Sequence, residues 1–204
     1  MDIPLLLFAK APIAGKVKTR LQSNCTAEKA AKIAEVLLEE SIIKATKFWP
    51  GTVYLSVALD IEHAFLQQML KKYSIELVSQ AEGDLGAKMY HALGEFGYPA
   101  AVMGCDAPHI QSDDLIRAYS LLSEGKPVLG PSEDGGYYFI GLEKPQIALF
   151  SNIEWGTSSV LTATLKIAQT HEIDFELLEP LNDVDEWQDL VAAAEQVPSL
   201  NVFI

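Results

Sequence analysis

Several hallmarks of membrane and secreted proteins are missing from this 204-residue chain. The longest apolar run, near Ile3–Ala9, contains Pro4 and is far too short to cross a bilayer. No positively charged segment precedes the run and no small-residue cleavage site follows it, so it does not have the pattern of a signal peptide. We therefore expect a cytoplasmic protein without a membrane span, in which Ile3–Ala9 forms a buried first strand.

Cysteine and basic residues are both scarce. Cys25 and Cys105 are the only cysteines and lie roughly eighty positions apart, which gives neither a disulfide framework nor metal-ligand spacing. The 28 acidic residues outnumber the 15 basic ones and leave a formal net charge of −13. A charge of this sign argues against nucleic acid as a partner.

Acidic residues are absent from one stretch of this acidic chain. Nothing between Ile3 and Ala27 is Asp or Glu, although the chain average would place about three acids there. Four of the fifteen basic residues, Lys10, Lys16, Lys18 and Arg20, lie in the same stretch. This composition predicts a bound anion. The alternative is a basic loop that is simply solvated.

Segments typical of strands and helices alternate along the chain, with no repeat, low-complexity tract or linker between them. We expect one domain over residues 1–204. The predicted strands are Ile3–Ala9, Thr52–Leu59, Ile75–Gln80, Ala100–Cys105, Val128–Gly130, Tyr137–Leu142 and a segment within Ile173–Leu178. The predicted helices are Thr26–Lys47 with Thr26 as N-cap, Glu62–Tyr73, Leu85 to Gly97, Ser112–Ser123, Ser158–Gln169 and a last one from Glu186.

Continuous apolar strands separated by amphipathic helices predict a parallel sheet that is covered on both faces, a three-layer α/β/α domain. One connection breaks the pattern. The Pro131–Gly136 turn between two strands is too short for a parallel crossover. We therefore expect one antiparallel strand in a mainly parallel sheet, with the ligand beyond the carboxyl ends of the strands.

The loop after the first strand is rich in cations but matches no common nucleotide motif. It contains neither GxGxxG nor GxxxxGK[ST]. The absence of these motifs argues against hydride transfer and against P-loop chemistry. Gly15 allows close approach of a ligand, Arg20 suits forked contacts to phosphate oxygens, and Lys10 and Lys18 act as point charges. We expect this loop to bind the phosphates of a nucleotide.

Two aspartates are candidate ligands for Mg²⁺ or Mn²⁺. Asp106 follows a buried strand, where a carboxylate needs a partner, a metal or a capping role in the next turn. Near the C-terminus, the spacing of Asp185 and Gln188 predicts a capping box, which leaves Asp183 without such a role. We therefore expect Asp106 and Asp183 to bind the metal, with Asp185 as the alternative to Asp183.

Asp134 and Tyr137 flank a pair of glycines, Gly135 and Gly136. A turn alone explains the Asp-Gly pair. Close approach of the backbone to a ligand, with Tyr137 as an aromatic wall, explains the whole block equally well. Both interpretations stay open from the residues alone.

Taken together, these blocks resemble the GT-A-type glycosyltransferase family associated with radical-SAM/selenodomain proteins, formerly DUF2064. The resemblance covers nearly the whole chain, and its blocks lie at Phe8–Leu21, Gly83–Met89, Gly104–Pro108, Gly130–Tyr138, Trp155–Leu161 and Asn182–Leu190. It implies the fold of the nucleotide-diphospho-sugar transferases. It also implies that Thr19 and Lys88 belong to the phosphate site and that Asp106 is the metal-binding aspartate.

The sequence departs from the family pattern at two positions. Lys88 stands where the family usually has arginine, which keeps the charge but loses the forked contact. Gly156 replaces the usual serine between Trp155 and Thr157, so a hydroxyl role at that position is in doubt.

The expected function is transfer from a nucleotide diphosphate-sugar to a small-molecule acceptor, with Mg²⁺ or Mn²⁺ as cofactor. Asp134 would be the base at the acceptor and Tyr137 would line its pocket. A second hypothesis is nucleotidyl transfer, in which a nucleoside triphosphate loses pyrophosphate. A third is a nucleotide-binding module without turnover.

Overall fold

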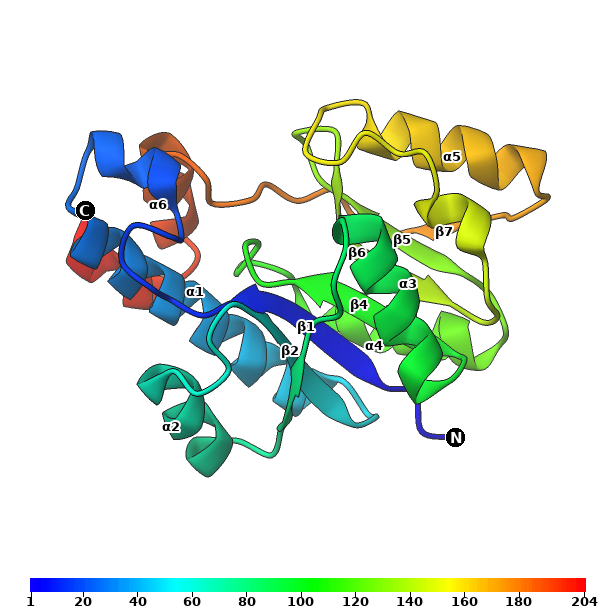
Figure 1. Cartoon of the computed structure of the whole chain (residues 1–204), viewed down its shortest axis with the longest axis horizontal. Coiled ribbons are helices and arrows are strands. Elements are labelled where there is room, and N and C mark those ends of the chain that lie inside the picture. Colours follow the sequence, from blue (N-terminus) through cyan, green and yellow to red (C-terminus); the bar gives the residue numbers. More distant parts are fainter.

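One mixed seven-stranded sheet forms the centre of the molecule (Figure 1). A computed structural model describes all of residues 1–204. The strand order across the sheet is β3-β2-β1-β4-β6-β5-β7. The strands are β1 Leu5–Lys10, β2 Val53–Ala58, β3 Glu76–Ser79, β4 Ala100–Gly104, β5 Val128–Pro131, β6 Tyr137–Leu142 and β7 Glu176–Leu177.

Six α-helices and three short 3-10 helices surround the sheet. The α-helices are α1 Ala27–Phe48, α2 Ala64–Lys72, α3 Leu85–Phe96, α4 Ser112–Ser123, α5 Val160–Thr170 and α6 Trp187–Ala194, and the 3-10 helices are η1 Thr19–Ser23, η2 Ile147–Phe150 and η3 Pro198–Phe203. Thr26 caps α1 as predicted, because its side chain accepts a hydrogen bond from Lys29 N at 3.2 Å. None of these helices is both long and apolar enough to cross a membrane.

The predicted antiparallel strand is β6. It runs antiparallel to both of its neighbours, β4 and β5, whereas β1 is parallel to β2 and β4. The turn between β5 and β6 spans only a few residues, so the chain reverses direction instead of crossing over the sheet. The prediction of a mainly parallel sheet with one antiparallel strand is therefore confirmed.

Apolar side chains cover both faces of the sheet, which confirms the three-layer arrangement. Alternate residues of β1 point to opposite faces: Leu5 and Leu7 join a core with α1, α2 and α4, and Leu6 joins a second core with α3 and α5. A third, smaller core joins α1 to α6 and η3. Each layer therefore contributes an apolar face, as a doubly covered sheet requires.

The connections bring distant segments to one edge of the sheet. β1, β2, β3 and β4 are parallel, so the loops that follow them leave from the same edge. Because β6 is reversed, its first residue, Tyr137, lies at that edge too. A bridge between Ser132 and Leu181 brings the segment before α6 beside the turn that precedes β6. This edge holds the candidate site.

Gly135 docks the turn before β6 onto the start of α5. Its φ is +92°, its carbonyl accepts a hydrogen bond from Leu161 N at 2.8 Å, and a Cβ would overlap the Ser158 carbonyl oxygen. Gly15 has a similar φ of +79° but nothing within 4 Å of a Cβ. Comparing substitutions at the two glycines therefore distinguishes the cost of backbone strain from the cost of steric overlap.

We expect Gly135→Ala to lower the free energy of unfolding by about 2–4 kcal/mol, because strain and overlap add. Gly15→Ala, the matched control, should cost about 1 kcal/mol through strain alone. Urea unfolding of both variants measures the difference. Equal losses at the two positions would show that the contact with Ser158 is unimportant.

Candidate functional site

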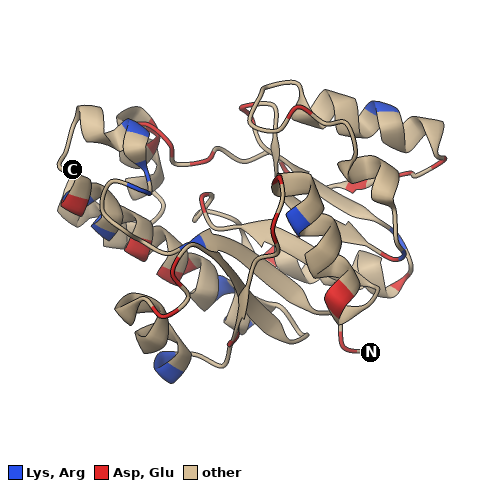
Figure 2. Cartoon of the chain, viewed as in Figure 1, with Lys and Arg blue, Asp and Glu red and all other residues tan.

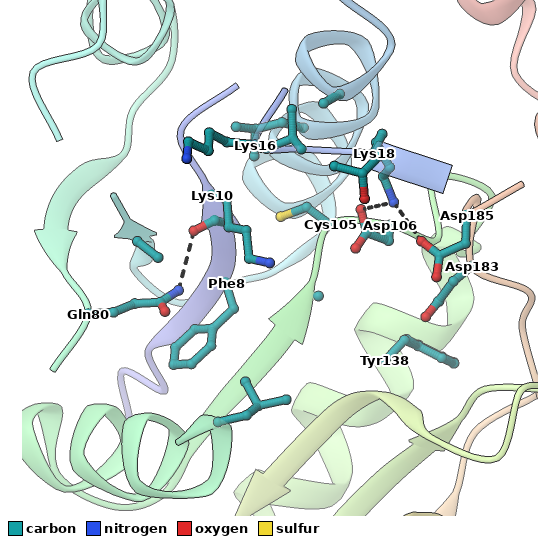
Figure 3. Close-up of a pocket in the computed structure, with 18 of the residues that line it drawn as sticks. Phe8, Lys10, Lys16, Lys18, Gln80, Cys105, Asp106, Tyr138, Asp183 and Asp185 are labelled. Carbon is teal, nitrogen blue, oxygen red and sulfur yellow. Dashed lines mark hydrogen bonds and ion pairs between the residues drawn. The ribbon is translucent and has the colours of Figure 1, made fainter. Parts of the chain in front are cut away.

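A cavity of about 650 Å³ opens at the carboxyl edge of the sheet. Every predicted site residue except Gly15 and Asp134 lines it. The lining includes Lys10, Lys18, Thr19, Arg20, Lys88, Asp106, Tyr137 and Asp183, together with Asp185 and Gln80. Figure 3 shows the three aspartates on one side of the cavity and Gln80 on the other.

Lys18 is the centre of the charged side of the cavity. Its ammonium group lies 2.6 Å from Asp106 Oδ1 and 3.2 Å from Asp185 Oδ1, and its side chain is only 7% exposed. Burial lowers the pKa of Lys18, but the two carboxylates outweigh burial and raise it above its ordinary value. Lys18 therefore stays charged and ties the first loop to β4 and to the segment before α6 (Figure 3).

The backbone of Lys18 is in the left-handed region, with φ 45° and ψ 44°. This conformation costs a non-glycine residue about 1 kcal/mol or more. The ion pairs of the buried Lys18 ammonium group with the partly exposed Asp106 and Asp185 offset that cost. A lysine that was expected to face a phosphate is instead held by carboxylates.

The prediction that Asp185 begins a capping box is wrong. The N-cap of α6 is Glu186, whose partner in the box is Asp189. Asp189 Oδ2 also accepts a hydrogen bond from Asp185 N at 3.1 Å, so the Asp185 side chain is not needed for the cap. It turns instead toward Lys18 and toward Arg20, whose Nη1 donates to Asp185 Oδ2 at 3.2 Å. Figure 2 shows these basic and acidic segments side by side.

Asp183 is half-buried and lacks a cationic partner of its own. Ser132 Oγ donates to its Oδ1 at 3.4 Å. Burial, together with the nearby Asp106 and Asp134 carboxylates, raises the pKa of Asp183 from its ordinary value of 3.8 to about 7. Lys18 opposes this rise without cancelling it. This part of the site therefore carries more negative charge than its cations balance.

The carboxylates fit Mg²⁺ or Mn²⁺ bound together with a phosphate. No group of three or more His, Cys, Asp or Glu side chains is gathered closely enough to hold a metal without other ligands. These cations need only one or two carboxylates, because phosphate oxygens and water complete the coordination shell. The poorly neutralised Asp183, beside Asp106, offers the hard oxygen donors that they prefer.

Free cations lie along the rest of the cavity. Lys10 ends β1 and Lys88 belongs to α3, and neither forms an ion pair with another residue. The Arg20 side chain is 66% exposed and has only its contact with Asp185. These three side chains can turn toward an anion without breaking a buried interaction.

The predicted acceptor residues have different surroundings. Tyr137 lines the cavity, its ring packs edge-on against Trp155 at 6.3 Å, and burial raises the pKa of its hydroxyl, so it stays protonated. Asp134 is exposed and outside the lining, and its Oδ1 accepts from Gly136 N at 2.9 Å, as in a turn cap. Gly15 also lies outside the lining, so the roles of Asp134 and Gly15 remain predictions.

Sequence reasoning missed Gln80 and Lys44. Lys44 Nζ donates to the carbonyl oxygens of Pro108 and Ile110 at 2.6 and 2.8 Å, which fixes the loop after Asp106 to α1. A lysine in a long helix gives no signal of this contact, because its partners are backbone atoms far away in the chain. Gln80 ends a predicted strand, and that position at the carboxyl edge was the one available signal.

Solved structures define the class of fold. A candidate nucleotide-diphospho-sugar transferase from Desulfovibrio desulfuricans G20 is 28% identical, with a TM-score of 0.81 over 94% of this chain and 87% of that one. Rv0371c from Mycobacterium tuberculosis H37Rv, in complex with manganese, has a TM-score of 0.54 at 14% identity, covering 96% and 99%. CMP:2-keto-3-deoxy-manno-octonic acid synthetase in complex with CTP has a TM-score of 0.57 at 10% identity, covering 99% of this chain and 99% of that one. The chain therefore has the nucleotide-diphospho-sugar transferase fold.

The family model described as "Uncharacterized protein conserved in bacteria (DUF2064)" matches residues 41–157, and the chain belongs to this family. The resemblance found in the sequence is thereby confirmed. No curated protein matches the sequence.

The raised pKa of Asp183 predicts a pH-dependent cost to stability. Because the folded chain binds this proton more tightly than the unfolded chain, ionisation between about pH 4 and pH 7 lowers the free energy of unfolding. Asp183→Asn should therefore stabilise the protein at pH 8, by on the order of 1 kcal/mol or more. The gain should shrink as the pH falls toward 4.

Thermal unfolding across this pH range measures the effect. Asp185→Asn is the matched control. It removes a carboxylate that is paired with Lys18 and Arg20, so it should not raise the stability of the protein. A stabilisation by Asp183→Asn that is the same at every pH would contradict this account.

Proposed function

We propose that this protein is a metal-dependent glycosyltransferase with a nucleotide diphosphate-sugar donor. The observation that carries the proposal is the meeting of three carboxylates and several free cations around one cavity at the carboxyl edge of the sheet. A fold shared with nucleotide-diphospho-sugar transferases supports it. The cavity volume, about 650 Å³, suits a ligand of nucleotide size.

The donor's diphosphate would lie between the aspartates and the basic side chains. Asp106 and Asp183 would hold Mg²⁺ or Mn²⁺, which would supply positive charge to the leaving diphosphate. Arg20 and Lys10 contact the phosphate oxygens, and Lys88 adds a point charge from α3. Lys18, whose side chain is buried, keeps Asp106 and Asp185 in place through its ion pairs with both.

The acceptor would enter on the β6 side of the site. Tyr137 lines the cavity there, but its hydroxyl is buried and stays protonated at neutral pH, so it cannot take a proton. Asp134 is the nearby carboxylate that could accept the proton of the acceptor hydroxyl. One of its oxygens caps the turn, and the other is free for this role.

Nucleotidyl transfer is the second candidate. The basic first loop favours it, since Lys18 and Arg20 line the cavity together, where they could hold the departing phosphates of a triphosphate. A protein of the same fold in complex with CTP also supports it. In this case pyrophosphate, not a nucleoside diphosphate, leaves.

Product analysis separates these functions. Purified protein with Mg²⁺ or Mn²⁺ is incubated with a panel of nucleoside triphosphates and diphosphate-sugars, and the products are resolved by ion-exchange chromatography. Release of nucleoside diphosphate supports glycosyl transfer, and release of pyrophosphate supports the second candidate. Binding without turnover would contradict both.

Asp106→Asn tests the metal site in the same assay. Asn keeps the shape of the side chain but removes its charge, so nucleotide binding should lose its dependence on Mg²⁺ or Mn²⁺. Isothermal titration with and without the metal measures this dependence. Undiminished metal dependence in the variant would rule out Asp106 as a ligand.

Asp134→Asn tests the proposed base. Asn can still accept the hydrogen bond from Gly136 N, so the turn should survive. We expect the turnover number to fall by about 100-fold with nearly unchanged donor affinity, because only the acceptor side loses a group. Glu133→Gln, on the neighbouring exposed residue, is the control and should leave turnover unchanged. Normal turnover in Asp134→Asn would leave Asp134 with a role in the turn alone.

A further inference from the structure

Gln80 is fixed at the cavity wall by three backbone contacts. Its own N–H donates to Val57 O at 2.9 Å, at the end of β3. Its side-chain amide nitrogen, Nε2, donates to Ser56 O at 3.0 Å and to Ala9 O at 3.3 Å. The side chain therefore reaches across β2 to β1, and both of its amide hydrogens are used.

These contacts decide which atom of the amide is available to a ligand. The opposite orientation would place Oε1 against two carbonyl oxygens, so the assignment of nitrogen and oxygen follows from the network itself. No protein group donates a hydrogen bond to Oε1. Gln80 thus presents the cavity with a hydrogen-bond acceptor and no donor.

The surroundings of Gln80 suit a flat, apolar ring. Phe8, Ala58 and Leu85 line the cavity with it, and Leu85 is 45% exposed although it is apolar. No acidic side chain belongs to this end of the lining; the three aspartates come from β4 and from the segment before α6. An apolar wall with one polar group is typical of a subsite that holds and orients an aromatic ring.

The two ends of the cavity lie over different strands of the sheet. Gln80 follows β3 and its amide reaches Ala9 on β1, whereas Asp106 follows β4. Figure 3 shows Gln80 and Phe8 on one side, Lys10 between, and Asp106 and Asp183 on the other. A ligand with its phosphates at the aspartates can therefore place its base against Phe8 and Gln80.

We propose that Gln80 selects the base of the nucleotide and favours one with an exocyclic amino group, cytosine or adenine, over its oxo counterpart. The inference rests on the proposed nucleotide function. An amino group donates to Oε1, whereas the carbonyl oxygen of uracil or hypoxanthine at the same place would face another acceptor. Since Nε2 is engaged by Ala9 and Ser56, the amide cannot turn over to satisfy the oxo base.

Two pairs of nucleotides isolate this contact, because their bases present an amino group or an oxygen at the same ring position. They are CDP against UDP and ADP against IDP. By isothermal titration with Mg²⁺, the protein should bind the amino member of at least one pair about 10-fold more tightly or better. Gln80→Met keeps the length of the side chain but removes the acceptor, so it should reduce the preference to within about 2-fold.

Two controls distinguish the loss of the base contact from a general loss of ligand binding. Inorganic pyrophosphate has no base, so Gln80→Met should bind it as the unchanged protein does. Gln67→Met alters a glutamine that donates to Ile61 O outside the cavity, and it should keep the full preference. If Gln80→Met fails to fold, the preference of the unchanged protein still tests the idea.

Equal binding of both members of each pair, or tighter binding of UDP and IDP, would overturn this inference and leave the proposed function standing. A preference that persists in folded Gln80→Met would assign the selection to another residue. If neither nucleotides nor pyrophosphate bind, the proposed function fails and this inference fails with it.

Discussion

The site is organised around the ammonium group of Lys18. Three carboxylates meet at the carboxyl edge of the sheet, and without a cation among them their repulsion would oppose the packing of the segment before α6. The buried ammonium group of Lys18 neutralises Asp106 and Asp185 at 2.6 and 3.2 Å, and both carboxylates remain partly exposed. Asp183 has no ion pair of its own, and burial together with the neighbouring carboxylates raises its pKa. The charge balance therefore leaves room for one further cation.

Hydrogen bonds to the backbone hold this charged group in position. Val184 N donates to Asp106 O at 2.8 Å, which joins the segment before α6 directly to the end of β4. Lys44 fixes the loop after Asp106 to α1 from the other side. Because these anchors hold the backbone around Asp106, the aspartates keep their places while Lys10, Arg20 and Lys88 remain free to meet a ligand.

The cavity has two chemically different ends because of the strand order. The loops after β1 and β4 carry charged side chains, whereas the apolar end with its fixed amide is formed by Phe8 of β1, Ala58 of β2, Leu85 of α3 and Gln80 after β3. A ligand with a ring at one end and phosphates at the other satisfies both.

Periodicity and turn chemistry in the sequence were enough to determine the α/β class, the presence of one antiparallel strand and the existence of the strands and α-helices, but not of the three 3-10 helices. They also placed Asp106, Tyr137 and the basic loop at one edge, because loops after parallel strands share an edge. The sequence alone did not predict which side chains pair with one another. Asp185 and Asp189 compete for the cap of α6 within a few residues, and only the folded chain, with Lys18 and Arg20 nearby, directs Asp185 to the site. The orientation of Gln80 likewise depends on carbonyl oxygens of two other strands. Tertiary structure decided these contacts because they join residues that are far apart in the chain and that no local spacing relates.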